Sequence, residues 1–108
     1  MSERVRRAMA LDAIEETVAR CGEHAKGMAE EAGHVQNELR FSISGAVKEA
    51  SAIYGIPYPE LMTEALKMLR DGLRNALCGL CEVRYVKPFE QDGEVVGMMV
   101  RFYVRRVA

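Results

Sequence analysis

Between residues 11 and 39, apolar or small residues recur at alternating steps of three and four, and polar residues fill the gaps. The stripe consists of Leu11, Ile14, Val18, Cys21, Ala25, Met28, Ala32, Val35 and Leu39. This spacing keeps one face of an α-helix apolar. The positions farthest from it are Glu16, Glu23, Glu30 and Asn37, which suits a solvent-facing side. We expect a helix over residues 3–32, with the rest of the chain organised around the stripe.

The centre of this stripe is made of small residues, Cys21, Ala25 and Ala32. A parallel coiled coil has bulky Ile, Val or Leu at these positions and opposite charges beside them, and neither feature is present here. Small residues instead allow another helix to approach closely. The pattern favours an antiparallel helix of the same chain as the main partner, with a second subunit as the alternative.

Residues 34–54 fit two descriptions. As a helix, they continue the stripe through Val35, Leu39 and Ile43. As a strand, apolar residues at 39, 41 and 43 alternate with polar ones at 40, 42 and 44, and a short helix follows from about residue 45 to Tyr54. The surrounding residues favour the helix. In the alternative, a third strand at 38–44 supplies a pairing partner for the C-terminal strands.

A break follows, because two prolines one residue apart, Pro57 and Pro59, cannot lie inside a helix. Apolar spacing then predicts a helix over 59–78, and Gly79 is suited to end it in the left-handed conformation. Residues 81–107 are typical of a β-hairpin, since Asp92-Gly93 is a strong signal for a two-residue turn.

The hairpin pattern also predicts a register. Counting outward from the turn pairs the residues of one face as Phe89–Val96, Lys87–Met98, Tyr85–Val100, Val83–Phe102 and Cys81–Val104. This mostly apolar face should pack on the helices. The other face then sets Arg84 directly opposite Arg101. A slip of one residue would exchange the two faces.

These elements predict an α+β fold in a single domain over residues 1–108: a long N-terminal helix, one or two further helices and a C-terminal antiparallel hairpin. Charge is balanced, with 15 basic and 16 acidic residues, so there is no general attraction to nucleic acid or membranes. No apolar run is long enough to span a membrane or serve as a signal peptide. Three cysteines argue against a secreted disulfide scaffold. We expect a cytoplasmic protein without membrane association.

A hairpin alone is marginal in water, and its second strand offers an outer edge that needs a cover. That cover is the strand at 38–44 or the same strand of another subunit. The leading hypothesis is a non-enzymatic interaction module that forms a homodimer through this edge, with a protein partner that the sequence does not identify. The edge residues are Val96, Met98, Val100, Phe102 and Val104.

The second hypothesis is a small nucleic-acid- or phosphate-binding protein. Its binding face would combine Arg84, Arg101, Tyr103 and Arg105 on the hairpin. Aromatic side chains stack on bases and arginines hold the backbone in such surfaces. In the predicted register Tyr85 points to the opposite face, which leaves Tyr103 as the aromatic beside the arginines.

The third hypothesis is a zinc-stabilised domain. Cys78 and Cys81 form a Cys-x-x-Cys pair, and Cys21 and His24 lie one helical turn apart, so the four supply a thiolate-rich ligand set. In the alternative without a metal, Cys21 and Cys81 are small buried apolar residues and Cys78 is a residue at the end of a helix. Redox catalysis is disfavoured because the pair follows a helix C-terminus, where the helix dipole does not stabilise a thiolate. No Gly-rich phosphate loop or nucleophile motif is present, and we expect neither a cofactor nor enzymatic activity.

Overall fold

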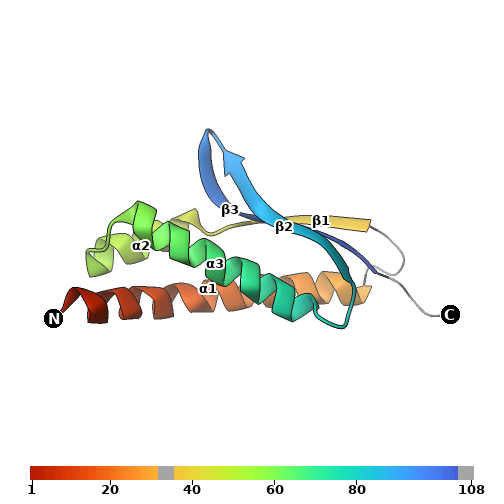
Figure 1. The fold of residues 1–108 in the computed structure, drawn as a ribbon, viewed down its shortest axis with the longest axis horizontal. Helices are drawn as coiled ribbons and strands as arrows, with labels where there is room; N and C mark the ends of the chain where they lie inside the picture. Colours follow the sequence, from red (N-terminus) through yellow and green to blue (C-terminus); the bar gives the residue numbers. More distant parts are fainter. Residues whose placement is uncertain (32–35, 105–108) are drawn as a thin grey trace.

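The computed structural model describes residues 1–31 and 36–104. The elements, in chain order, are α1 (Glu3–Glu31), β1 (Gln36–Ser42), α2 (Ser44–Tyr54), α3 (Tyr58–Leu77), β2 (Glu82–Gln91) and β3 (Glu94–Tyr103). This arrangement confirms the α+β fold with a long N-terminal helix and a C-terminal hairpin. Helix α1 crosses the whole molecule, and the sheet lies on one side of the helices (Figure 1).

The helix favoured for residues 34–54 is wrong and the strand-plus-helix alternative is confirmed, because Gln36–Ser42 form strand β1 and Ser44–Tyr54 form helix α2. Phe41 is buried and Leu39 half-buried toward the helices, whereas Arg40 and Ser42 are exposed. This alternation of period two is satisfied only when the segment pairs with another strand. Two residues of the apolar stripe, Ala32 and Val35, lie outside the described part of the chain.

The sheet has three antiparallel strands in the order β1-β3-β2, so β3 is the central strand. One face of the sheet packs on α3 beneath β2 and β3, and on α1 beneath β1. The side chains that β3 sends toward the helices, together with the residue that follows the strand, are all buried: Val96, Met98, Val100, Phe102 and Val104. Met98, Val100, Phe102 and Val104 share one hydrophobic core with apolar side chains of the helices, including Ile14, Leu69, Leu73 and Leu77.

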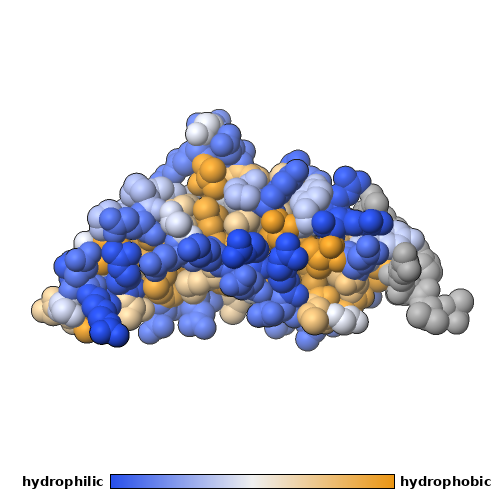
Figure 2. All heavy atoms as spheres, in the orientation of Figure 1, coloured by the Kyte–Doolittle hydropathy of each residue, from blue (hydrophilic) through white to orange (hydrophobic). Residues whose placement is uncertain are grey.

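The distribution of exposed and buried side chains can be compared with the apolar stripe predicted for α1. Figure 2 shows hydrophilic side chains over most of the visible face, with hydrophobic atoms gathered along the hairpin and where it meets the helices. On α1 the buried positions include Ile14, Val18 and Ala25, as the stripe predicts, while Cys21 and Met28 are half-buried at its margins. Three residues outside the predicted stripe, Ala10, Gly22 and Ala29, are also buried. The buried face of α1 therefore matches the stripe at Ile14, Val18 and Ala25 and lies one residue away from it elsewhere.

The main partner of α1 is α3, and it runs parallel to α1 rather than antiparallel as expected. The N-terminal ends of the two helices lie together, since Arg7 of α1 contacts Glu60 of α3. Further along, Gly22 of α1 approaches Ala76 near the C-terminal end of α3. Helix α2 is the antiparallel neighbour: it starts near the middle of α1 and ends beside Arg6 (Figure 1). The chain returns to the start of α1 through β1 and α2, so α3 sets out in the same direction as α1.

Local signals fix the ends of these elements. The Ser2 hydroxyl accepts a hydrogen bond from the Val5 N–H at 3.2 Å, which caps α1. Gly55 has φ 68° and ends α2, and Gly79 has φ 80° just after α3. Asp92 and Gly93 both have positive φ, 54° and 79°, as a two-residue hairpin turn requires.

The predicted hairpin register holds at both ends and is wrong by one residue in the middle. Val83 pairs with Phe102 and Glu90 with Val95, as expected, but Tyr85 pairs with Arg101 and Lys87 with Met99. Two bulges, between residues 83 and 85 and between 89 and 90, account for the shift. Tyr85 and Lys87 therefore lie on the outer face of the sheet, with Arg101.

Gly97 marks the closest approach between β1 and β3. A Cβ atom added there would overlap the carbonyl oxygen of Phe41, which is backbone and cannot move aside. We expect Gly97→Ala to destabilise the protein by about 3 kcal/mol or more. Gly27→Ala, in α1, is the matched control: its Cβ would meet nothing within 4 Å, and gain of helix propensity should stabilise by about 0.5–1 kcal/mol. Denaturant unfolding measures both, and equal stability of the two variants would contradict this account.

Candidate functional site

The edge predicted on the second hairpin strand is not an edge. Strand β1 pairs along it, Leu39 opposite Val100 and Phe41 opposite Met98, so β3 has a neighbour on both sides. Val96, Met98, Val100, Phe102 and Val104 are at most 6 % exposed and belong to the core. The interface predicted at these residues is therefore wrong, and the reason is that residues 36–42 cover the edge from within the chain.

Among residues 1–31 and 36–104, the sheet instead ends at β1 on one side and at β2 on the other. The Ile43 N–H donates to the Val96 carbonyl at 2.8 Å, which fixes the phase of the β1–β3 ladder. Backbone groups alternate in direction along a strand, so those of Leu39 and Phe41 face β3, and those of Glu38 and Arg40 face outward. The outer side of β1 therefore presents N–H and C=O groups in position to pair with another strand.

The edge at β2 is different. Pro88 lies opposite Met98 at a position where the backbone groups of β2 face away from β3. Proline has no N–H, so this part of the outer edge offers no donor to an added strand. Arg84 is the extra residue of a bulge, which interrupts regular pairing. Proline and bulges protect an edge from strand addition. The β1 ladder has a continuous register from Gln36 to Ser42, so β1 is the edge better suited to accept a strand.

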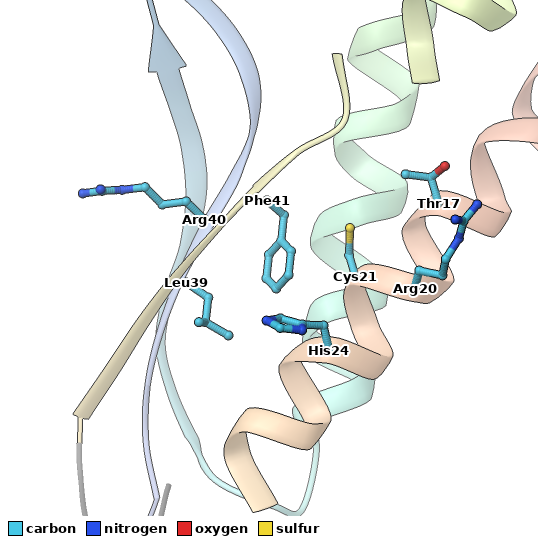
Figure 3. A pocket seen from close by; sticks show the side chains of 7 residues that line it. All are labelled: Thr17, Arg20, Cys21, His24, Leu39, Arg40 and Phe41. Carbon is cyan, nitrogen blue, oxygen red and sulfur yellow. The ribbon is translucent and has the colours of Figure 1, made fainter. Parts of the chain in front are cut away.

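A groove of about 350 Å³ lies beside this edge, between β1 and α1. Leu39 and Phe41 point from β1 toward Cys21 and His24 on α1, and Arg40 points to the other side of the strand (Figure 3). The rings of His24 and Phe41 meet edge to face, with centroids 5.9 Å apart. Burial raises the pKa of the Cys21 thiol. The groove is thus a mostly apolar hollow, with Thr17 and Arg20 also in its lining, and it opens next to backbone groups that face away from β3.

The outer face of the sheet carries a polar network centred on Glu38. The Tyr85 hydroxyl donates to the Glu38 carboxylate at 2.6 Å, and Arg40 Nη2 lies 3.1 Å from its other oxygen. The hydrogen bond from Tyr85, more than the nearby cations, lowers the pKa of Glu38, and the same bond raises the pKa of Tyr85. The Lys87 ammonium lies 4.4 Å from the centre of the Tyr85 ring. Glu38 is therefore held ionised and oriented at the edge of the sheet.

The structure keeps two residues of the predicted nucleic-acid face together, since Arg101 and Tyr103 share the outer face of β3, and it displaces Arg84 from them. Arg84 lies in the bulge, 3.6 Å from Glu82, and does not oppose Arg101. Arg101 shares the outer face with Tyr85 and Glu38, and Tyr103 pairs with Glu82 near the end of β3. Arg105 lies outside the described residues. The bulge places Tyr85 and Lys87 on the outer face, whereas the register predicted from the sequence had placed both on the face toward the helices.

The basic N-terminus does not extend that face. Arg6 donates to the Tyr54 carbonyl at 3.2 Å and so satisfies the end of α2. Arg7 lies 2.8 Å from Glu60 and 3.3 Å from Glu3, and these carboxylates raise its pKa. Both side chains tie α1 to the other helices.

The predicted zinc site is not assembled. Cys21 and His24 face the groove at β1, whereas Cys78 follows the end of α3 and is exposed. Cys81 is half-buried, and its thiol lies 3.9 Å from the Leu77 carbonyl. Within residues 1–31 and 36–104, no group of three or more His, Cys, Asp and Glu side chains is placed to hold a metal ion. The two halves of the ligand set lie on different elements that do not converge.

Comparisons with protein-family models, curated proteins and solved structures gave no match to this chain. Among the helices of the described residues, none has the length and hydrophobicity of a membrane span. The sequence contained a signal for the site at β1, the alternation of apolar and polar residues from 39 to 44. The alternative in which a strand there covers the outer edge of the second hairpin strand is confirmed, although the sequence favoured a helix for this segment.

Thiol reactivity tests the placement of the cysteines. Cys78 is exposed, whereas Cys21 and Cys81 are half-buried and burial raises their pKa. At mildly alkaline pH we expect a disulfide reagent such as dithiobis-nitrobenzoate to modify one thiol quickly and two slowly, since the thiolate is the reactive form. Cys78→Ala should remove the fast phase, and denaturant should make all remaining thiols fast. A fast phase that persists in Cys78→Ala would show that a groove or core thiol is open to solvent.

Proposed function

We propose that this chain is a non-catalytic interaction module that forms a homodimer by strand pairing at the edge of β1. The observation that carries the proposal is the outward-facing backbone of Glu38 and Arg40 beside the apolar groove of Leu39, Phe41 and Cys21. Strand addition uses main-chain hydrogen bonds for affinity and pockets for alternate side chains for specificity. The β1 edge offers both.

The contrast between the two edges supports this choice. An unprotected edge is a site of aggregation unless a partner covers it, and proteins blunt such edges with proline, bulges or charge. Here β2 has Pro88 and the bulge at Arg84, while β1 pairs in continuous register along its whole length. We infer that β1 is left open because it binds protein. The three cysteines are all free, which suits a reducing compartment, and we place the module in the cytoplasm.

A proline substitution tests the edge without breaking the sheet. The Arg40 N–H faces outward, so Arg40→Pro removes a donor for an added strand and leaves the ladder to β3 intact. We expect the wild-type chain to have the molar mass of a dimer by light scattering, and Arg40→Pro to be a folded monomer.

Arg40→Ala is the matched control, because it removes the side chain and keeps the N–H; it should remain a dimer at high protein concentration. Thermal unfolding followed by circular dichroism checks that each variant is folded. A wild-type chain that stays monomeric at all concentrations, or an Arg40→Pro variant that stays dimeric, would contradict the proposal.

A second candidate is binding of single-stranded nucleic acid on the outer face of the sheet. The bulge at Arg84 favours it, because it places Tyr85 and Lys87 on the same face as Arg101. A flat sheet with aromatic side chains and cations is suited to base stacking and phosphate contact. Two carboxylates on this face, Glu38 and Glu82, reduce its positive charge, which is why we rank it second.

This candidate has its own test. Lys87→Glu should weaken binding to a labelled single-stranded oligonucleotide at low salt by roughly tenfold, measured by fluorescence anisotropy. Lys67→Glu is the control, because it makes the same charge change on an exposed position of α3, away from the sheet face. Binding that does not weaken as salt rises, or equal effects of the two substitutions, would exclude a specific basic face.

A further inference from the structure

The phase of the β1–β3 ladder restricts how a second copy can pair with β1. Glu38 and Arg40 face outward, so they must lie opposite outward-facing residues of the partner. A two-fold antiparallel pair that satisfies this condition near the middle of the strand is centred on Glu38, Leu39 or Arg40. Centring on Leu39 pairs the whole of Gln36–Ser42, the range over which β1 is regular.

Charge distinguishes the three registers. Centring on Glu38 places it opposite the partner's Glu38, and centring on Arg40 places two guanidinium groups together, which is destabilising across strands. Centring on Leu39 sets Glu38 opposite the partner's Arg40 and Arg40 opposite the partner's Glu38. Both the longest overlap and the only pairing of opposite charges at these positions therefore occur in the same register.

We propose that a second copy of this chain pairs with β1 antiparallel, with Leu39 opposite the partner's Leu39. This inference rests on the proposed function and specifies its partner and register. It joins two three-stranded sheets into one of six strands, with the helices of both copies on the same face.

The environment of the central residues suits this register. The two Leu39 residues form a non-hydrogen-bonded pair, in which side chains are closest. Leu39 is only half-buried in the single chain and points toward the helices beside the groove (Figure 3). Pairing places a second leucine against it, so each subunit covers apolar surface that the other leaves open. The hydrogen bond from Tyr85 already orients Glu38 before a partner binds.

Disulfide trapping reads the register directly. In a chain with Cys21, Cys78 and Cys81 replaced by alanine, single cysteines are introduced as Glu38→Cys, Leu39→Cys and Arg40→Cys. Residues opposite each other across a two-fold axis have the Cα separation that a disulfide needs. We expect Leu39→Cys to form a covalent dimer fastest on mild oxidation, seen on non-reducing gels. Fastest trapping at position 38 or 40 would overturn the register while leaving the dimer proposal standing.

Charge reversal in the native cysteine background gives an independent test. Arg40→Glu puts two carboxylates on the outer edge, and Glu38→Arg puts two guanidinium groups there. Each variant alone should have its dimer weakened at least roughly tenfold, whereas a mixture of the two should form a heterodimer, in which both cross-strand pairs are again of opposite charge. Analytical ultracentrifugation of the separate and mixed chains measures this.

Arg84→Glu is the matched control, because Arg84 and Glu82 form the equivalent ion pair on the other edge, at 3.6 Å. It should leave the dimer unchanged. If the wild-type chain dimerises but mixing the two β1 variants does not restore a dimer, the register is wrong. If the wild-type chain is a monomer, the proposed function itself fails, so the two failures are distinguishable.

Discussion

The hydrogen bonding of β3 on both of its sides is the constraint on which the rest of the structure depends. Because β1 and β2 pair with it on both sides, the inward-facing side chains of β3 from Val96 to Phe102 are buried between the sheet and the helices. The close approach of β1 at Gly97 admits no side chain there. Placing β3 in the centre also determines which strand is left at the edge, so the candidate site is a consequence of the pairing order.

A single extra residue in β2 decides the chemistry of the outer face. Without the bulge at Arg84, Tyr85 and Lys87 would point toward the helices and two arginines would oppose each other. With it, Val86 is buried opposite Val100, and Tyr85 reaches Glu38 across the sheet. Side chains alternate with a period of two, so inserting one residue moves every following side chain to the other face until a second irregularity restores the phase. The bulge thus avoids burying a lysine.

The two edges of the sheet illustrate how backbone geometry, rather than a side-chain motif, defines a candidate interaction site. Pro88 and the bulge limit pairing at β2, whereas β1 keeps a regular ladder next to an apolar groove. The residues that matter there, Glu38, Leu39 and Arg40, form no recognisable motif. Their importance comes from the direction in which the backbone groups point, which depends on the phase of the pairing with β3.

The sequence by itself determined the long N-terminal helix with much of its apolar stripe, the turn at Asp92-Gly93 and the α+β class. Each depends on interactions between residues a few positions apart, which periodicity and backbone preference report directly. Only the tertiary structure decided that residues 36–42 are a strand, that α3 runs parallel to α1, and that β1 rather than β3 is the edge. These outcomes depend on hydrogen bonds and packing between segments far apart in the chain. A local pattern that fits both a helix and a strand is decided by the partner it finds.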